Sequence, residues 1–171
     1  MENICSERQE EALRLSSVWI FFIASLLHFG YSSTGFFPLS FISSVNESVW
    51  EHTKIVFFAA LFYDIFLYFR YFKSNHNFVA GLAPSLASII VTIPFLFYGY
   101  SGILGFNVLA IDLLITFLAG WIAQNILMRY SCSPKNYKEY KIFSLLFVAA
   151  MVILFVVFTW YPPNLPLFTS P

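Results

Sequence analysis

Five long apolar segments restrict what this chain can fold into. They occupy residues 15–37, 50–72, 78–98, 104–128 and 142–161. A membrane-spanning helix needs about 20 mostly apolar residues, so each segment is long enough to cross a bilayer. The apolarity is continuous, without the period-two alternation of a membrane β-barrel, and lipid offers no partner for backbone groups outside a helix. We therefore predict an all-α, polytopic membrane helix bundle with five transmembrane helices.

The composition supports a single membrane domain over residues 1–171. Only 11% of the residues are charged, whereas soluble proteins average about 25%. The five segments leave room for short tails over residues 1–14 and 162–171 but for no separate soluble domain. The formal net charge is zero and like charges do not form a run. We therefore expect the lipid bilayer, and no nucleic acid, as a partner.

The nine Lys and Arg residues indicate how the bundle is oriented. Five spans place the termini on opposite sides, and only Lys54 falls on the side of the C-terminus. The others fall on the side of the N-terminus, namely Arg8, Arg14, Arg70, Lys73, Arg129, Lys135, Lys138 and Lys141. By the positive-inside rule the N-terminus is cytoplasmic, the C-terminus lies outside, and we expect a multi-pass protein of the plasma membrane. Cys5 and Cys132 then both lie on the reducing side, so we expect no disulfide and no metal motif from them.

The polar stretch between the first two segments is the main candidate for a functional site. Ser44 or Asn46 is predicted to cap the second helix, and Glu47 to favour the positive end of its dipole. Glu51 and Lys54 are spaced for an ion pair on that helix. A purely structural interpretation covers the cap and the ion pair. The stretch holds more polar groups than a cap requires, however, and this favours a functional interpretation.

Two other segments carry polar residues on one helical face. Helical spacing aligns Ser25, His28, Ser32 and Gly35 in the first segment, and Asp112, Thr116, Gly120 and Gln124 in the fourth. Such stripes face protein or trapped water, because lipid exposure would cost a few kcal/mol per charged group. The predicted ligand-binding residues, which would converge on one outward-facing pocket, are His28, Asn46, Glu47, Glu51, His52, Lys54 and Asp112. Asp64 lies deeper in the second segment and is expected to snorkel or to pair near the cytoplasmic edge.

Two further segments are predicted to serve packing. The third apolar segment combines Pro84 and Pro94 with Gly81 and other small residues, a pattern that permits kinks and close helix approach. The Pro-rich tail of residues 162–168 cannot be helical throughout, and its apolar residues predict that it lies along the outer face or folds back over it.

Three functions are consistent with this pattern. The first is a pocket that binds a small polar or cationic ligand or a lipid head group. The second is a membrane-embedded hydrolase, with Glu51 or His52 as the catalytic acid or base and a divalent metal such as zinc held by His28, His52 and Asp112. The third is a structural or partner-binding subunit in which the polar cluster only locks helices together. A proton-coupled carrier is a lesser alternative.

Two resemblances to known families add to this interpretation. Ser48, His52 and Asp64 resemble part of the zinc site of alkaline ceramidase and adiponectin receptor type membrane hydrolases. The fourth and fifth segments contain no histidine, so that resemblance implies only a fragment of the zinc site.

The second resemblance covers nearly the whole chain. His28, the Asn-Glu-Ser-x-Trp-Glu-His-x-Lys motif that begins at Asn46, and the Phe-Thr-x-x-Pro-Pro-x-x-Pro-Leu-Phe motif that begins at Phe158 carry it. They resemble a domain-of-unknown-function family of small bacterial polytopic membrane proteins. This resemblance implies a membrane-bundle fold and assigns no activity.

Overall fold

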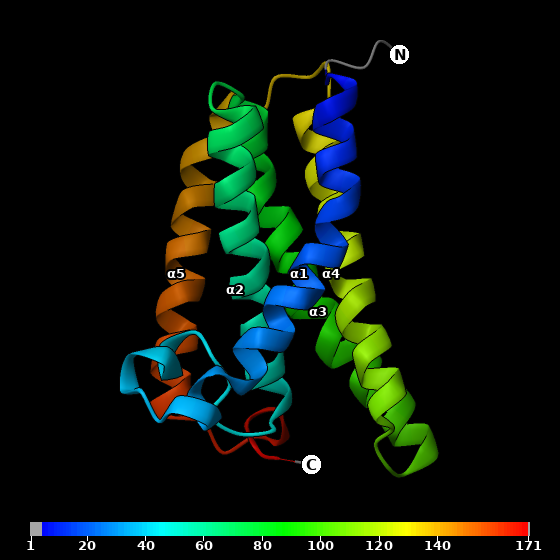
Figure 1. Cartoon of the computed structure of the whole chain (residues 1–171), viewed down its shortest axis with the longest axis vertical. Helices are drawn as coiled ribbons and strands as arrows, with labels where there is room; N and C mark the ends of the chain where they lie inside the picture. The colour runs from blue at the N-terminus through cyan, green and yellow to red at the C-terminus, as the bar shows by residue number, and fades with distance from the viewer. Residues whose placement is uncertain (1–4, 171) are drawn as a thin grey trace.

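Five long helices run along the length of the molecule, as the computed structural model of residues 5–170 shows (Figure 1). They are α1 (Glu7–Thr34), α2 (Val49–Leu67), α3 (His76–Leu104), α4 (Leu109–Ser131) and α5 (Lys141–Trp160). Each is long and apolar enough to cross a membrane, α2 together with the π-helical turn η2 (Tyr68–Phe72). The described residues contain no strand. The predicted all-α bundle with five potential membrane spans is therefore confirmed.

The first helix begins earlier than its apolar segment. Ser6 forms a capping box, in which its side chain accepts from the Gln9 backbone N–H and the Gln9 side chain accepts from the Ser6 N–H. These two bonds satisfy backbone donors that a helix start leaves unpaired, so α1 includes residues expected in a tail. Residues 1–4 and 171 of the expected tails lie outside the described residues.

The second helix begins at a different residue from the one expected. Its N-cap is Ser48, whose hydroxyl accepts from the Glu51 N–H, so the assignment of the cap to Ser44 or Asn46 was wrong. The Asn46 side chain instead accepts from the Ser48 N–H at 2.9 Å, which makes a turn before the helix. Glu47 consequently precedes the helix, whereas Glu51 lies in its first turn.

The start of α1 and the end of α4 lie at the same end of the bundle, here called the N-terminal end (Figure 1). The last described segment of the chain, which ends at Ser170, lies at the opposite end, here called the C-terminal end (Figure 1). At the N-terminal end Cys5 and Cys132 form a disulfide with a Cα–Cα distance of 5.0 Å. The expectation that these thiols stay unpaired was therefore wrong. It rested on their compartment, and a separation of 127 residues in sequence gave no sign of their proximity.

Helix α3 packs against α2, α4 and α5, and small residues allow the close approach. Near Pro84, the Ala83 N–H donates to the Ser144 hydroxyl oxygen of α5 at 2.8 Å. The Ser85 hydroxyl donates to the Ala123 carbonyl oxygen of α4, also at 2.8 Å. The predicted packing role of this segment is thus confirmed. The chain after α5 forms the turn η4 (Pro166–Phe168) and folds back, as was predicted, against α2.

Replacing Gly81 by alanine is expected to destabilise the bundle by about 1–3 kcal/mol. A Cβ atom at Gly81 would lie 2.7 Å from the Cβ of Tyr130 in α4, so the two helices would have to separate. Thermal unfolding in detergent measures the loss. Gly102→Ala is the matched control on the same helix, because nothing lies within 4 Å of a Cβ there, and it should be neutral or slightly stabilising. Equal unfolding temperatures for the two variants would contradict the close approach.

Candidate functional site

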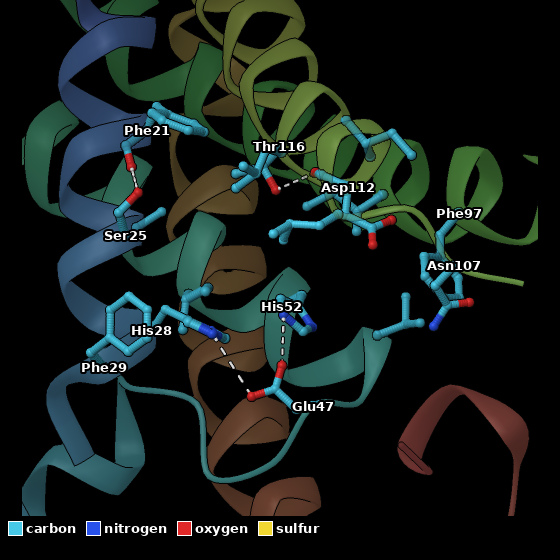
Figure 2. A pocket seen from close by; sticks show the side chains of 17 residues that line it. Phe21, Ser25, His28, Phe29, Glu47, His52, Phe97, Asn107, Asp112 and Thr116 are labelled. Carbon is cyan, nitrogen blue, oxygen red and sulfur yellow. Dashed lines mark hydrogen bonds and ion pairs between the residues drawn. The ribbon is translucent and has the colours of Figure 1, made fainter. Parts of the chain in front are cut away.

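A cavity of about 470 Å³ lies between α1, α2, α3 and α4, toward the C-terminal end of the bundle (Figure 2). Its wall is mostly apolar and includes Phe21 and Phe29 of α1, Ile93 and Phe97 of α3, and Leu113 of α4. Polar side chains interrupt this wall at a few places only. A largely apolar cavity of this size with a few polar groups is typical of small-molecule sites in proteins.

His28, Glu47 and His52 form a cluster at one end of the pocket, and we call them the His–Glu–His cluster (Figure 2). His28 comes from α1, Glu47 from the turn before α2, and His52 from α2. One potential ligand atom from each residue lies within 4.8 Å of the other two. The two imidazole rings are stacked, with their centroids 5.2 Å apart. Two thirds of the Glu47 side chain is exposed, so this end of the pocket reaches the surface.

Asp112 lies on another side of the same pocket, apart from the cluster (Figure 2). The Tyr100 hydroxyl donates to its carboxylate, and the same hydroxyl oxygen accepts from the Val108 N–H at 3.2 Å. These bonds tie the end of α3 to the start of α4. Asp112 is therefore held in place by protein groups, and it lines the pocket together with Thr116.

Glu51 and Lys54 do not line the pocket, because their side chains point to the opposite side of α2. Their carboxylate oxygen and ammonium nitrogen are 2.6 Å apart, and both side chains are almost completely buried. The ammonium also donates to the Ser40 carbonyl oxygen and to the Thr159 hydroxyl, and the carboxylate accepts from the Val45 N–H. The pair locks α2 to α5 and to the loop before α2. This is the structural interpretation of these two residues.

Asp64 belongs to a separate buried group deeper in the bundle. Its Oδ1 atom accepts from the Gln124 amide at 2.9 Å, and the Gln124 oxygen lies 3.0 Å from the Ser16 hydroxyl. Asp64 is 1% exposed, so of the two expectations for this residue snorkelling was wrong, and the side chain pairs with Gln124 instead. A partner on α4 lets the side chain stay inside the bundle.

The structure thus separates the seven predicted ligand-binding residues. It brings His28, Glu47, His52 and Asp112 to one pocket and places Glu51, Lys54 and Asn46 outside it. Of the two catalytic candidates, only His52 lines the pocket. The polar stripe on α4 is divided in the same way: Asp112 and Thr116 face the pocket, and Gln124 joins the Asp64 group.

Sequence reasoning missed several residues of these sites. No sequence pattern marks the apolar wall of the pocket, because an apolar residue such as Phe97 or Ile93 fits a membrane span equally well when it faces lipid and when it faces a cavity. Tyr100 and Thr159 gave a weak signal, as hydroxyl-bearing residues close to the end of an apolar segment. Their partners across the bundle, Asp112 and the Glu51–Lys54 pair, lie on other helices and become evident only in the folded protein.

The fragment that resembles a ceramidase-type zinc site does not assemble. The Ser48 hydroxyl caps α2, and the Ser48 carbonyl oxygen lies 3.0 Å from Nδ1 of His52. Asp64 is bound to Gln124 and does not line the pocket.

Comparison with known proteins gives a family but no activity. No curated protein and no solved structure matches the chain. The family model named "Family of unknown function (DUF6512)" matches residues 1–171. The chain therefore belongs to that family of unknown function, as a multi-pass membrane protein whose helical bundle contains a pocket with the His–Glu–His cluster at one end.

Proposed function

We propose that the pocket binds an amphipathic small molecule, such as a lipid, with its polar head group at the His–Glu–His cluster and its apolar part along the aromatic wall. One observation carries this proposal: His28, Glu47 and His52 gather at the surface-reaching end of a 470 Å³ cavity whose wall is otherwise mostly apolar. The polar lining residue Asp112 lies apart from them and is bonded to Tyr100. An amphiphile has the same division between a polar and an apolar part.

The burial of the cluster supports a polar head group at this position. The side chains of His28 and His52 are 25% and 34% exposed. They are sheltered enough to contact a ligand at close range, yet they reach the solvent through Glu47. A carboxylate and the free nitrogens of neutral imidazoles accept hydrogen bonds, so they suit a head group that carries hydroxyl or amine functions.

The location of the pocket leads to a proposal about the membrane side. Eight of the nine Lys and Arg residues occur at or near the N-terminal end of the bundle, and Lys54 is buried at the other end. The positive-inside rule then assigns the N-terminal end to the cytoplasm and the pocket to the outer leaflet of the plasma membrane. The ligand would enter from that leaflet or from the aqueous phase next to it.

Native mass spectrometry of the purified protein tests ligand binding. We expect a co-purified amphiphile that tandem fragmentation identifies by its head group. Ser25 lines the pocket, and Ser25→Phe should fill part of the cavity and reduce the bound fraction at least about tenfold, because a bulky side chain would overlap the ligand. Ser32→Phe is the matched control, since Ser32 is exposed on the same helix and does not line the pocket.

The outcome is decisive in both directions when the two variants unfold at similar temperatures. A ligand retained by Ser32→Phe and lost from Ser25→Phe supports the proposal. Wild-type protein without a bound amphiphile, even after incubation with a total lipid extract, would overturn it. Equal retention by the two variants would do so as well.

A further inference from the structure

The distances within the His–Glu–His cluster are too long for ordinary hydrogen bonds and close to those between ligands of one metal ion. Nε2 of His52 lies 3.5 Å from one Glu47 oxygen, and Nε2 of His28 lies 3.8 Å from the other. A hydrogen bond between such atoms would measure about 2.7–3.2 Å. Tetrahedral zinc, with bonds of about 2.0–2.1 Å, holds its ligand atoms roughly 3.3 Å apart. A common central ion is compatible with these two separations, and one potential ligand atom from each residue lies within 4.8 Å of the other two.

Both imidazoles are oriented for metal binding by bonds at their other nitrogen. Nδ1 of His52 lies 3.0 Å from the Ser48 carbonyl oxygen, which can only accept, so this nitrogen carries the proton. Nδ1 of His28 faces the Ser44 hydroxyl at 3.4 Å, and that hydroxyl donates to the His28 carbonyl oxygen. In its neutral form each ring therefore presents an unprotonated Nε2 toward Glu47. Histidines that bind metals usually have such a partner at the second nitrogen.

The backbone on either side of Glu47 is also fixed. The Asn46 side chain accepts a hydrogen bond from the Ser48 N–H, and the Glu51 carboxylate accepts one from the Val45 N–H. Among the residues that the structure describes, Lys54 supplies the ammonium group near this end of α2, and Glu51 engages it on the opposite side of the helix. It therefore does not compete with a cation for Glu47.

We propose that His28, Glu47 and His52 bind one divalent transition-metal ion, zinc in preference, and leave a coordination position open toward the pocket. Two imidazole nitrogens and one carboxylate oxygen suit zinc better than magnesium or calcium, which prefer oxygen ligands. Three protein ligands with a free fourth position are typical of zinc sites that bind an exogenous molecule. Asp112 is not a ligand, because it stands outside the set of close donor atoms and is bonded to Tyr100.

Binding of a ligand head group at the open coordination position rests on the proposed function. Metal binding by the three side chains is independent of it. An acidic head group, such as a carboxylate or a phosphate, would occupy the fourth position while its chain lies against the aromatic wall. The cluster, whose residues line the pocket, is in a position to make this contact.

Metal titration of the purified protein tests the proposal. The protein should carry a histidine-free affinity tag, be stripped with a chelator and then be titrated with zinc and with cobalt(II) in detergent. We expect about one equivalent of zinc to remain after desalting, and a cobalt d–d spectrum typical of four-coordinate nitrogen and oxygen ligation. His52→Ala, His28→Ala and Glu47→Gln should each weaken zinc binding at least about tenfold.

His76→Ala is the matched control. His76 is the third histidine of the chain and begins α3 at the N-terminal end of the bundle, remote from the pocket. This variant should bind zinc as the wild type does. Wild-type protein that retains no zinc, or His52→Ala that retains as much as His76→Ala, would overturn the metal site.

Two further measurements separate this proposal from the proposed function. Acetohydroxamate, a small metal-binding group, should alter the cobalt spectrum, and an unchanged spectrum would overturn the open position. Ser25→Phe should lose the amphiphile and still bind zinc, because Ser25 is not part of the cluster. A protein that binds an amphiphile but no zinc would overturn the metal site and leave the proposed function intact.

Discussion

Replacing Lys54 by methionine is expected to lower the free energy of unfolding by about 3–5 kcal/mol. The substitution leaves the Glu51 carboxylate buried without its counter-charge, with the Thr159 hydroxyl and the Val45 N–H as remaining hydrogen-bond donors. Two hydrogen bonds do not replace a cation at 2.6 Å in the interior of the bundle. Thermal or denaturant-induced unfolding in detergent measures the loss.

A double-substitution cycle isolates the ion pair from other effects. Glu51→Gln combined with Lys54→Met removes both charges, so the double variant should be more stable than Lys54→Met alone. Lys138→Met is the matched control at an exposed lysine and should change stability by no more than about 0.5 kcal/mol. A Lys54→Met variant as stable as Lys138→Met would show that the pair does not hold α2 to α5.

Breaking the disulfide is expected to have the second largest effect. Cys5→Ser, or reduction of the wild type, should lower stability by about 2–4 kcal/mol, because the bond closes a long loop and restricts the unfolded chain. The ends of this loop are 127 residues apart. The loss of stability should be smaller than loop-closure entropy predicts for a soluble chain of this length. The reason is that the spans of the unfolded protein remain helical in micelles, so the unfolded chain has less entropy to lose. Unfolding with and without reductant measures it.

The two cysteine variants control for effects of the reductant other than cleavage of the disulfide. Cys5→Ser and Cys132→Ser should be equally destabilised, and reductant should have no further effect on either. A wild-type protein that loses no stability on reduction, while alkylation shows that two thiols have been freed, would contradict this prediction.

The redox state of the same bond in cells tests the proposed orientation. With the N-terminal end in the cytoplasm, alkylation of intact growing cells should find Cys5 and Cys132 reduced, and the bond should form once the cytoplasm is made oxidising. A bond that is fully formed in growing cells would place the N-terminal end on an oxidising side. That result would overturn the orientation derived from the Lys and Arg distribution.

The position of the pocket was partly predictable. Residues that precede or begin a membrane span lie near a membrane face wherever the helices pack, so Glu47 and His52 had to lie near one end of the bundle. His28, near the end of α1, had to lie near the same end. That their rings stack against each other is a property of the α1–α2 contact, which no local pattern encodes.

The separation of Glu47 from Glu51 was not predictable, and its cause is the start of α2. If Asn46 capped the helix, both carboxylates would share one helical face at i,i+4. Because Ser48 caps it, Glu47 lies in the preceding turn and reaches the histidines, whereas Glu51 turns toward Lys54 and α5. A shift of two residues in the helix start thus decides which acid belongs to the pocket and which to the core.

The sequence alone determined the number of apolar spans, their helical form and the end of the bundle at which the polar cluster lies, because hydropathy and backbone hydrogen bonding act over short stretches of chain. The tertiary structure alone decided the Cys5–Cys132 bond, the Asp64–Gln124 contact and the grouping of His28 with Glu47 and His52. Each of these depends on how a helix is rotated about its axis and which neighbour it meets. In a chain whose apolar segments are apolar on nearly every face, only packing sets that rotation.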